Sequence, residues 1–214
     1  MSPLDSMQEK ESLFVVGCGG HAKVVIDLLE RQNRYQIAFL LDDCPSRKET
    51  FFCGYLIIGG REDLENQPEE TRPKKFIVAI GDNQQRLAAS NFLTNRGLQA
   101  ATAIHPSAQL GNGVEIGAGT VIMAGTVINA DSKIGSHVII NTGATVDHDC
   151  HIADGVHIAP GATLCGSVTI GTGTTVGAGA TIIPGMTIGS HRLIKAGTTV
   201  TDHNQDLVPA TTDD

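Results

Sequence analysis

One feature of this chain limits its possible folds more than any other: an aliphatic residue recurs at every sixth position from Leu110 to Val200. The sixteen positions of this series hold only Ile, Leu or Val, and none breaks the period. A helix repeats its buried face every ~3.6 residues and a strand every second residue, so neither explains a period of six. A fixed period of six predicts a solenoid in which each hexad forms one short strand and one turn.

Three hexads complete one triangular coil, so residues eighteen apart are expected to stack at the strand spacing of about 4.8 Å. Sixteen hexads then make roughly five coils. Since no hexad carries an insertion, we expect a rigid rod without a protruding loop. The alternative, a sandwich of ordinary strands, has no reason to keep a strict period. Glycine directly follows the aliphatic residue in six hexads, where we expect tight corners that need backbone freedom: Gly111, Gly117, Gly135, Gly171, Gly177 and Gly189.

The chain before the solenoid has the pattern of a small α/β unit. Strand, helix and strand follow one another, which favours a parallel sheet of the Rossmann-like kind. The expected strands are 13–18, 36–41 and 75–80, with a strand or hairpin at 51–58 and helices at 21–32 and 84–96. We therefore expect a flexible lead-in at 1–12, a Rossmann-like domain at 13–104, a β-helix domain at 105–202 and a tail at 203–214.

Composition narrows the function classes. The 15 Lys and Arg against 23 Asp and Glu give a net charge of −8, which argues against non-specific nucleic-acid binding. No apolar run is long enough for a membrane span, and residues 1–12 do not resemble a signal peptide. The 5 cysteines are odd in number and form no CxxC motif. Together these features predict free thiols and a cytoplasmic protein.

A glycine-rich turn, Gly17–His21, follows the first expected strand and opens a helix. Backbone N–H groups and a helix N-terminus at such a turn can hold a pyrophosphate, although a tight strand-to-helix turn is the plainer alternative. Asp42 and Asp43 end the next strand, where an acid commonly binds a ribose or base; a solvated turn is the alternative. The two features in this order favour nucleotide binding. The unit is too short for a full dinucleotide fold.

One hexad, 146–151, departs from the small-residue pattern and holds His148 between Asp147 and Asp149. A histidine beside a carboxylate is a natural general base, and a solvated turn residue is the alternative. His157 follows nine residues later, half a coil away, so the two histidines of one chain are expected on opposite sides of the prism. They can share a cleft only across subunits, which a cyclic trimer provides.

A metal site and a cysteine nucleophile are rival interpretations of this stretch. His148, Cys150 and His151 are close in sequence, but neighbours in a strand point in opposite directions, so we expect no metal. Cys150 and Cys165 suit the solenoid core better than an acyl-transfer role.

Five segments, together with the hexapeptide repeat, form a recognisable combination: Gly17–Lys23, Leu40–Asp43, Ala79–Asn83, His105–Pro106 and Asn141–Cys150. In these segments the chain resembles the sialic-acid O-acetyltransferase-like sugar acetyltransferases, whose hexapeptide repeats form a left-handed parallel β-helix. It is most similar to the UDP-4-amino-sugar N-acetyltransferases of bacillosamine biosynthesis, over roughly residues 13–200.

The resemblance implies acetyl transfer from acetyl-CoA to the C4 amine of a UDP-linked amino-deoxy sugar. The homotrimer and the expected lack of a metal follow from the geometry above. It makes His148 the general base and Asp149 the carboxylate that orients it, where family members often have Glu. It assigns acetyl-CoA contacts to His157, Gly166, Ala178 and Ala196, with the Gly166 amide polarising the thioester carbonyl. It assigns sugar-nucleotide contacts to Gly19, Gly20, His21, Asp42, Asp43 and Gly81.

One segment departs from the family. Its usual Gly-x-Pro-Ala-Lys closing segment is matched here only by Pro209 and Ala210. Arg192 and Lys195 are the candidate partners of the CoA phosphates, and a solvated edge is the alternative for both.

Three other functions stay open at this point. The first is O-acetylation of sialic acid or another cell-surface sugar. The second is a solenoid assembly or nucleotide sensor without chemistry. The third is a zinc enzyme of the carbonic-anhydrase kind on the same scaffold.

Overall fold

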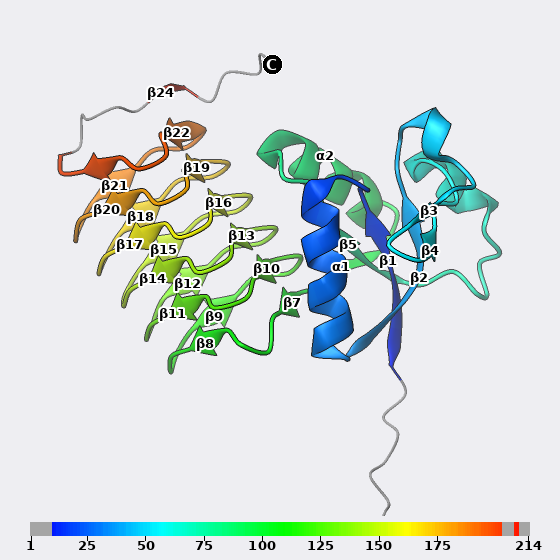
Figure 1. Cartoon of the computed structure of the whole chain (residues 1–214), viewed down its shortest axis with the longest axis horizontal. Coiled ribbons are helices and arrows are strands. Elements are labelled where there is room, and N and C mark those ends of the chain that lie inside the picture. The colour runs from blue at the N-terminus through cyan, green and yellow to red at the C-terminus, as the bar shows by residue number, and fades with distance from the viewer. Residues whose placement is uncertain (1–9, 203–207, 210–214) are drawn as a thin grey trace, which may run out of the picture.

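The computed structural model describes residues 10–202 and 208–209. Most of the predicted lead-in and most of the predicted tail therefore lie outside the described residues. The chain forms a small α/β domain beside a long solenoid (Figure 1). This is the predicted fold class, and the structure confirms it.

The N-terminal domain is built on a four-stranded, all-parallel sheet in the order β2-β1-β5-β6. The central strand β1 carries the fully buried run Leu13–Val16, as expected for a strand with neighbours on both sides and helices on both faces. The strands are β1 (Glu11–Val16), β2 (Tyr35–Leu41), β5 (Lys75–Val78) and β6 (Gln99–Ala100).

Two helices, α1 (Gly20–Gln32) and α2 (Asn83–Thr94), cover opposite faces of this sheet. Alternate residues of β1 divide accordingly: Leu13 packs in the cluster with α1, and Phe14 in the cluster with α2. Within α1, the buried stripe runs through Ala22, Val25, Ile26, Leu28 and Leu29, and the neighbouring Val24 is 43% exposed.

Shorter elements link β2 to β5. A hairpin of β3 (Phe51–Phe52) and β4 (Tyr55–Leu56) forms within the range predicted for it. Two 3₁₀ turns flank the hairpin, at Pro45–Arg47 and Arg61–Asn66.

The six-residue period folds into three flat parallel sheets, one for each side of a triangular prism. The first face contains β7 (Ala103–Ile104), β10 (Val121–Ile122), β13 (Ile139–Ile140), β16 (His157–Ile158), β19 (Thr175–Val176) and β22 (Arg192–Ile194), with β24 (Val208–Pro209) antiparallel at its end. The second face contains β8 (Gln109–Leu110), β11 (Val127–Ile128), β14 (Thr145–Val146), β17 (Thr163–Leu164), β20 (Thr181–Ile182) and β23 (Thr199–Val200). The third face contains β9 (Glu115–Ile116), β12 (Lys133–Ile134), β15 (His151–Ile152), β18 (Thr169–Ile170) and β21 (Thr187–Ile188).

Residues eighteen apart pair throughout, as Ile122 does with Ile140 and Ile140 with Ile158. Every aliphatic residue of the series from Ile122 onward is buried in one continuous core. Leu110 is 41% exposed because it belongs to the first coil, which has no coil beneath it. The predicted stacking is confirmed.

The reason predicted for the recurrent glycines is wrong. A Cβ on Gly111 would lie 2.6 Å from the amide nitrogen of Ala130, and one on Gly177 would lie 2.5 Å from that of Ala196. These glycines allow close approach of the next coil, and their φ angles are not positive. The left-handed residue lies two positions later in each hexad, usually glycine but also Asp131, His137, Asp149, Ser167 and His191.

The N-terminal domain packs on the lower coils of the first face through α1 (Figure 1). The outward residues there are apolar and join the α1 core cluster: Ala103, Val121, Met123 and Ile139. Solenoid pairing begins at β7, two residues ahead of the predicted start at 105. Neither helix of the described ranges is long and apolar enough to cross a membrane.

Candidate active site

The residues predicted to bind the sugar nucleotide line one cavity of about 470 Å³. The carboxyl ends of β1, β2 and β5 meet at this edge of the sheet, which is where parallel sheets place ligands. The turn after β1 provides Gly19, Gly20 and His21, the end of β2 provides Asp42 and Asp43, and the end of β5 provides Gly81.

The two aspartates of the cavity do different work. Oδ2 of Asp42 accepts hydrogen bonds from the Cys18 amide and from Arg47 Nη1, each at 3.0 Å, so this carboxylate braces the glycine-rich turn. The Asp43 carboxylate is 52% exposed and pairs with Arg61 at 2.6 Å. Burial favours a higher pKa for Asp43, but its bonds with Arg61 outweigh this and lower the pKa. Asp43 is therefore a charged and partly exposed group in the lining of this cavity, which also contains Arg47.

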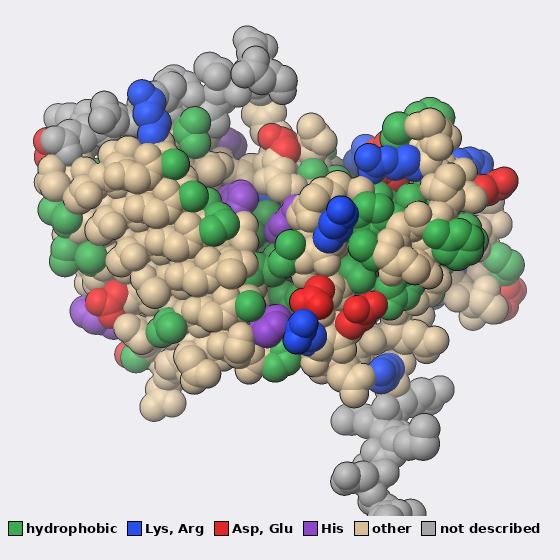
Figure 2. Space-filling model, viewed as in Figure 1, with side chains coloured by type: hydrophobic (Ala, Val, Ile, Leu, Met, Phe, Trp, Pro, Cys, Tyr) green, Lys and Arg blue, Asp and Glu red, His purple; other side chains and the backbone are tan. Residues whose placement is uncertain are grey.

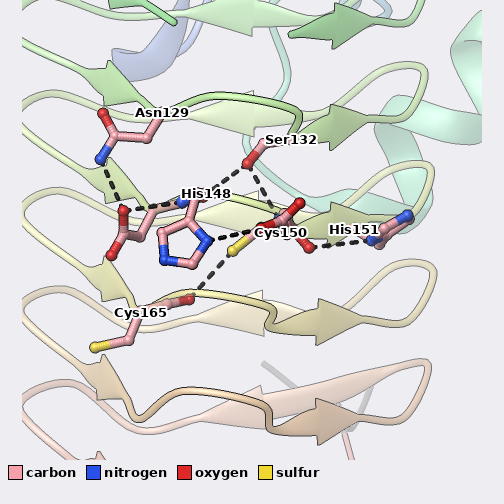
Figure 3. A network of polar contacts seen from close by, with 8 residues as sticks. Asn129, Ser132, His148, Cys150, His151 and Cys165 are labelled. Atoms are coloured by element: carbon pink, nitrogen blue, oxygen red, sulfur yellow. Dashed lines mark hydrogen bonds and ion pairs between the residues drawn. The ribbon is translucent and has the colours of Figure 1, made fainter. Parts of the chain in front are cut away.

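His148 and Asp149 form an exposed pair in the turn after β14 (Figure 3). His148 Nδ1 lies 2.8 Å from Asp149 Oδ2, so the ring donates this proton to the carboxylate and Nε2 is left as the basic nitrogen. The hydrogen bond that His148 donates to Asp149, followed by the negative charge of Asp147, raises the pKa of His148 above its ordinary value. This arrangement suits a general base.

Asp147 holds this turn in place together with two residues that were not predicted, Asn129 and Ser132 (Figure 3). Oδ1 of Asp147 accepts from the His148 amide at 2.9 Å and from Asn129 Nδ2 at 2.8 Å. Ser132 Oγ donates to the Asp147 carbonyl at 2.7 Å and accepts from the Cys150 amide at 3.1 Å. The hydroxyl thus joins both ends of the turn that carries His148.

A sequence signal for this contact exists. Buried hydroxyl residues stand two positions before the aliphatic residue at Thr120, Thr126, Ser132 and Thr174. Thr120 and Thr174 make the same pair of bonds at other corners. The recurrence of the hydroxyl at this offset therefore predicts the pair of hydrogen bonds, one donated to a carbonyl and one accepted from an amide, that we call a corner staple.

Gly166 lies directly against the His148 ring, eighteen residues along the chain. A Cβ at this position would come within 2.6 Å of His148 Nε2. Only glycine leaves room for the imidazole here, which places the buried Gly166 backbone beside the basic nitrogen.

His157 lies on the first face, away from His148, as the half-coil spacing predicts. Asn141 Oδ1 accepts from the Thr142 amide, so Asn141 Nδ2 donates to His157 Nε2 at 3.1 Å and the ring proton is on Nδ1. The ring centroid lies 6.4 Å from that of His21 in the glycine-rich turn. Figure 2 shows histidine side chains at this domain junction. Burial, together with the charge of Arg86, lowers the pKa of both His21 and His157 to about 4, so both are neutral at pH 7.

The structure does not bring all predicted acetyl-CoA residues together within one chain. Ala178 and Ala196 are exposed and stack on the corner between the first and second faces, joined by the bond from the Gly197 amide to the Ala178 carbonyl. Gly166 lies on the corner between the second and third faces. Arg192 and Lys195 lie near the end of the solenoid, and Ala210 lies outside the described residues.

The cysteines are free thiols. Cys150 is fully buried, with its Sγ donating to the Cys165 carbonyl at 3.2 Å, whereas His151 is exposed on the outside of the third face. Within residues 10–202, no group of three or more His, Cys, Asp or Glu side chains is arranged to hold a metal ion.

A hexapeptide solenoid with a histidine–carboxylate pair on one corner, joined to a cavity-bearing α/β domain, defines the class of hexapeptide-repeat transferases. Two family models match the chain: the PglD N-terminal domain over 12–93, and the bacterial transferase hexapeptide model over 131–166 and 149–184.

Relatives of known activity narrow the class. The chain is 38% identical over 105 residues to UDP-N-acetylbacillosamine N-acetyltransferase of Bacillus subtilis, an alignment that spans 46% of this chain and 44% of that protein. A structure of perosamine N-acetyltransferase from Caulobacter crescentus, in complex with CoA and GDP-perosamine, matches with a TM-score of 0.84 and 38% identity, over 89% of this chain and 88% of that one. The acetyltransferase domain of PglB from Neisseria gonorrhoeae matches with a TM-score of 0.83 and 34% identity, over 94% and 100%. The chain belongs to this family of hexapeptide-repeat sugar N-acetyltransferases with a PglD-type N-terminal domain, which confirms the predicted family.

Proposed function

We propose that the protein transfers the acetyl group of acetyl-CoA to the C4 amine of a UDP-linked 4-amino-dideoxy sugar. The observation that carries this proposal is the exposed His148–Asp149 pair with the Gly166 backbone beside its basic nitrogen. A related enzyme is a UDP-N-acetylbacillosamine N-acetyltransferase, and another was solved with CoA bound.

The proposed chemistry needs only one proton carrier. The sugar amine attacks the thioester carbonyl, and His148 Nε2 takes the proton that the amine loses as the C–N bond forms. The Gly166 amide stabilises the negative carbonyl oxygen. The C–S bond then breaks, and the CoA thiolate takes the proton from the imidazolium. Asp149 keeps the ring oriented in both steps, and the net products are the N-acetyl sugar and CoA.

The proposed site lies between subunits of a trimer. The sugar-nucleotide cavity and His157 belong to one side of the molecule, and His148 to the opposite corner. His148 of one subunit, together with the cavity and His157 of its neighbour, would complete a site that one chain lacks. The division into a sugar-nucleotide domain at 13–104 and an acetyl-transfer domain at 105–202 is part of the same proposal.

A GDP-linked amino sugar is the second candidate substrate. The perosamine N-acetyltransferase, solved in complex with GDP-perosamine, is matched over 88% of its length. The match to the bacillosamine enzyme covers under half of either chain. O-acetylation has less support, since these two relatives are both named as N-acetyltransferases.

The first experiment measures CoA release with a free-thiol reagent, using acetyl-CoA with UDP-4-amino-4,6-dideoxy-N-acetylglucosamine, GDP-perosamine or sialic acid. We expect turnover that needs the UDP-amino sugar and falls at least about a hundredfold in His148→Ala. His105→Ala, which changes a histidine at the start of the solenoid, is the control and should keep wild-type activity. Preference for GDP-perosamine or sialic acid would overturn the substrate proposal, and full activity of His148→Ala would overturn the catalytic one.

A further inference from the structure

Arg86 of α2 is the largest of the fully buried side chains, with 1% of its surface exposed. It lies between the N-terminal domain and the solenoid, and hydrogen bonds account for all five of its N–H groups. Nε donates to the His137 carbonyl at 2.8 Å, Nη1 to the Ile80 and Gly81 carbonyls at 3.1 and 3.0 Å, and Nη2 to Asn83 Oδ1 and the Gly155 carbonyl at 2.7 and 2.8 Å.

Each of these acceptors is a neutral oxygen. A buried charge is costly unless it is fully hydrogen-bonded, so this guanidinium depends on the placement of its acceptors. Burial lowers the pKa of Arg86 to about 10, which leaves it charged at pH 7. A lysine has three donors on a single nitrogen and cannot reproduce the planar fork.

The contact extends over three coils. His137, Gly155 and Gly173 are eighteen residues apart and form a column at the corner between the third and first faces. Arg86 binds the first two carbonyls of this column, and Asn83, one turn earlier on α2, donates to the Gly173 carbonyl at 2.9 Å and to Thr175 Oγ1 at 2.9 Å. One face of one helix thus docks on three successive coils.

Two further contacts show that this corner is fitted to α2. Ser90 Oγ lies 2.9 Å from Nδ1 of the left-handed residue His137. A Cβ on Gly155 would lie 2.6 Å from Leu87 Cδ1, so any larger residue at 155 would push α2 away. The side chains that make the docking face are Asn83, Arg86, Leu87 and Ser90.

The same guanidinium reaches the proposed substrate cavity. Ile80 and Gly81, whose carbonyls bind Nη1, line that cavity at the end of β5. Arg86 therefore joins the rim of the cavity directly to the solenoid corner, through bonds on opposite sides of one planar group.

We propose that Arg86 is a positioning residue that fixes the sugar-nucleotide cavity relative to the solenoid, so that a bound amino sugar reaches the acetyl group. This proposal rests on the proposed function. Loss of the Arg86 guanidinium and its hydrogen bonds should leave the sugar-nucleotide site and the acetyl-CoA site intact but change the distance between them. Displacement of about 1 Å costs up to about a hundredfold in rate when two reactants must be aligned.

The test compares Arg86→Lys with Arg96→Lys. Arg96 follows α2 and pairs only with residues of the N-terminal domain, Glu62, Glu65 and Phe92, so it is a matched control. In Arg86→Lys we expect kcat to fall at least about tenfold, while the dissociation constants of UDP and of CoA, measured by calorimetry, stay within about threefold of wild type. Hydrogen exchange should accelerate in α2 and around Gly155 and Gly173, and Arg96→Lys should show none of these changes.

Two results would overturn the proposal: unchanged kcat in Arg86→Lys, or a loss of UDP affinity as large as the loss of activity, which would mean that Arg86 only shapes the cavity. If Arg86→Lys does not fold, Asn83→Ala is the second variant. It removes only the bonds to Gly173 and Thr175 and one acceptor of Arg86. This variant should also lower kcat. If the wild type acetylates none of the sugars, the proposed function fails, and unchanged exchange in the variants would then also reject the docking role.

Discussion

The backbone conformation of Asp149 explains how a solenoid corner can hold the His148–Asp149 pair. Most corners of the solenoid place glycine in the left-handed conformation, but here the position is occupied by Asp149, with φ of 58°. Aspartate tolerates this conformation better than most residues. The corner turns the short carboxylate toward the preceding ring, and Asp149 Oδ2 lies 2.8 Å from His148 Nδ1.

Asp149→Asn tests the pKa of the base. Asn also tolerates the left-handed conformation, so we expect the fold to persist. Because the hydrogen bond that His148 donates to the Asp149 carboxylate is the main cause of the raised pKa of His148, its loss should move the acid limb of the kcat/KM profile to lower pH. The plateau at high pH should fall about ten- to a hundredfold, since the ring loses its orientation.

The pH dependence of the wild-type enzyme gives the direction in which this acid limb should run. As the proposed base, His148 would act only when unprotonated, so we expect wild-type activity to rise as pH increases through its raised pKa. Asp149→Glu keeps the charge and is the control. An acid limb that does not move in Asp149→Asn would mean that a different group limits the rate.

At the scale of the element, the corner staple connects stability with catalysis. Ser132 and Thr174 make equivalent pairs of hydrogen bonds, but only the corner stapled by Ser132 carries His148. Removing either hydroxyl leaves a buried amide without its acceptor.

Ser132→Ala and Thr174→Val should therefore destabilise the protein to a similar extent, by about 1–3 kcal/mol each. Only Ser132→Ala should also lower kcat, by about tenfold or less, because it loosens the turn that holds the base. Thermal or denaturant unfolding and the thiol assay measure the two effects. An equal loss of kcat in both variants would show that the staple acts through global stability alone.

Several elements were predictable from the sequence because their signals are local. The period of six predicted the three faces, and the order of strand, helix and strand predicted the parallel sheet. His148 and Asp149 were found because their hexad departs from its neighbours. The close-approach role of Gly111 and Gly177 was not found, since it depends on the backbone of the next coil.

At the scale of the molecule, the arrangement of His148 and His157 predicts complementation between inactive subunits. Co-expressed His148→Ala and His157→Ala chains should form mixed trimers in which some clefts receive both intact histidines. Random mixing would restore about a quarter of wild-type activity, because one interface in four combines the two intact partners.

Each variant alone should be inactive or nearly so in the thiol assay. If the mixture is only as active as the average of the two separate variants, a shared site is contradicted. Both histidines would then act in the site of a single subunit.

The sequence by itself determined the solenoid, the parallel α/β domain and the local pair His148–Asp149, because each depends on residues within a few positions or on a strict repeat. Only the tertiary structure decided the rest. Ser132 contacts residues 15 and 18 positions away, and Arg86 contacts residues 51 and 69 positions away, in another domain. The Ser132 contacts arise when coils stack and follow the repeat, since Thr120 and Thr174 make the same pair of bonds. The Arg86 contacts arise only when the two domains dock, and the linear order of side chains does not indicate which carbonyls this buried donor will meet.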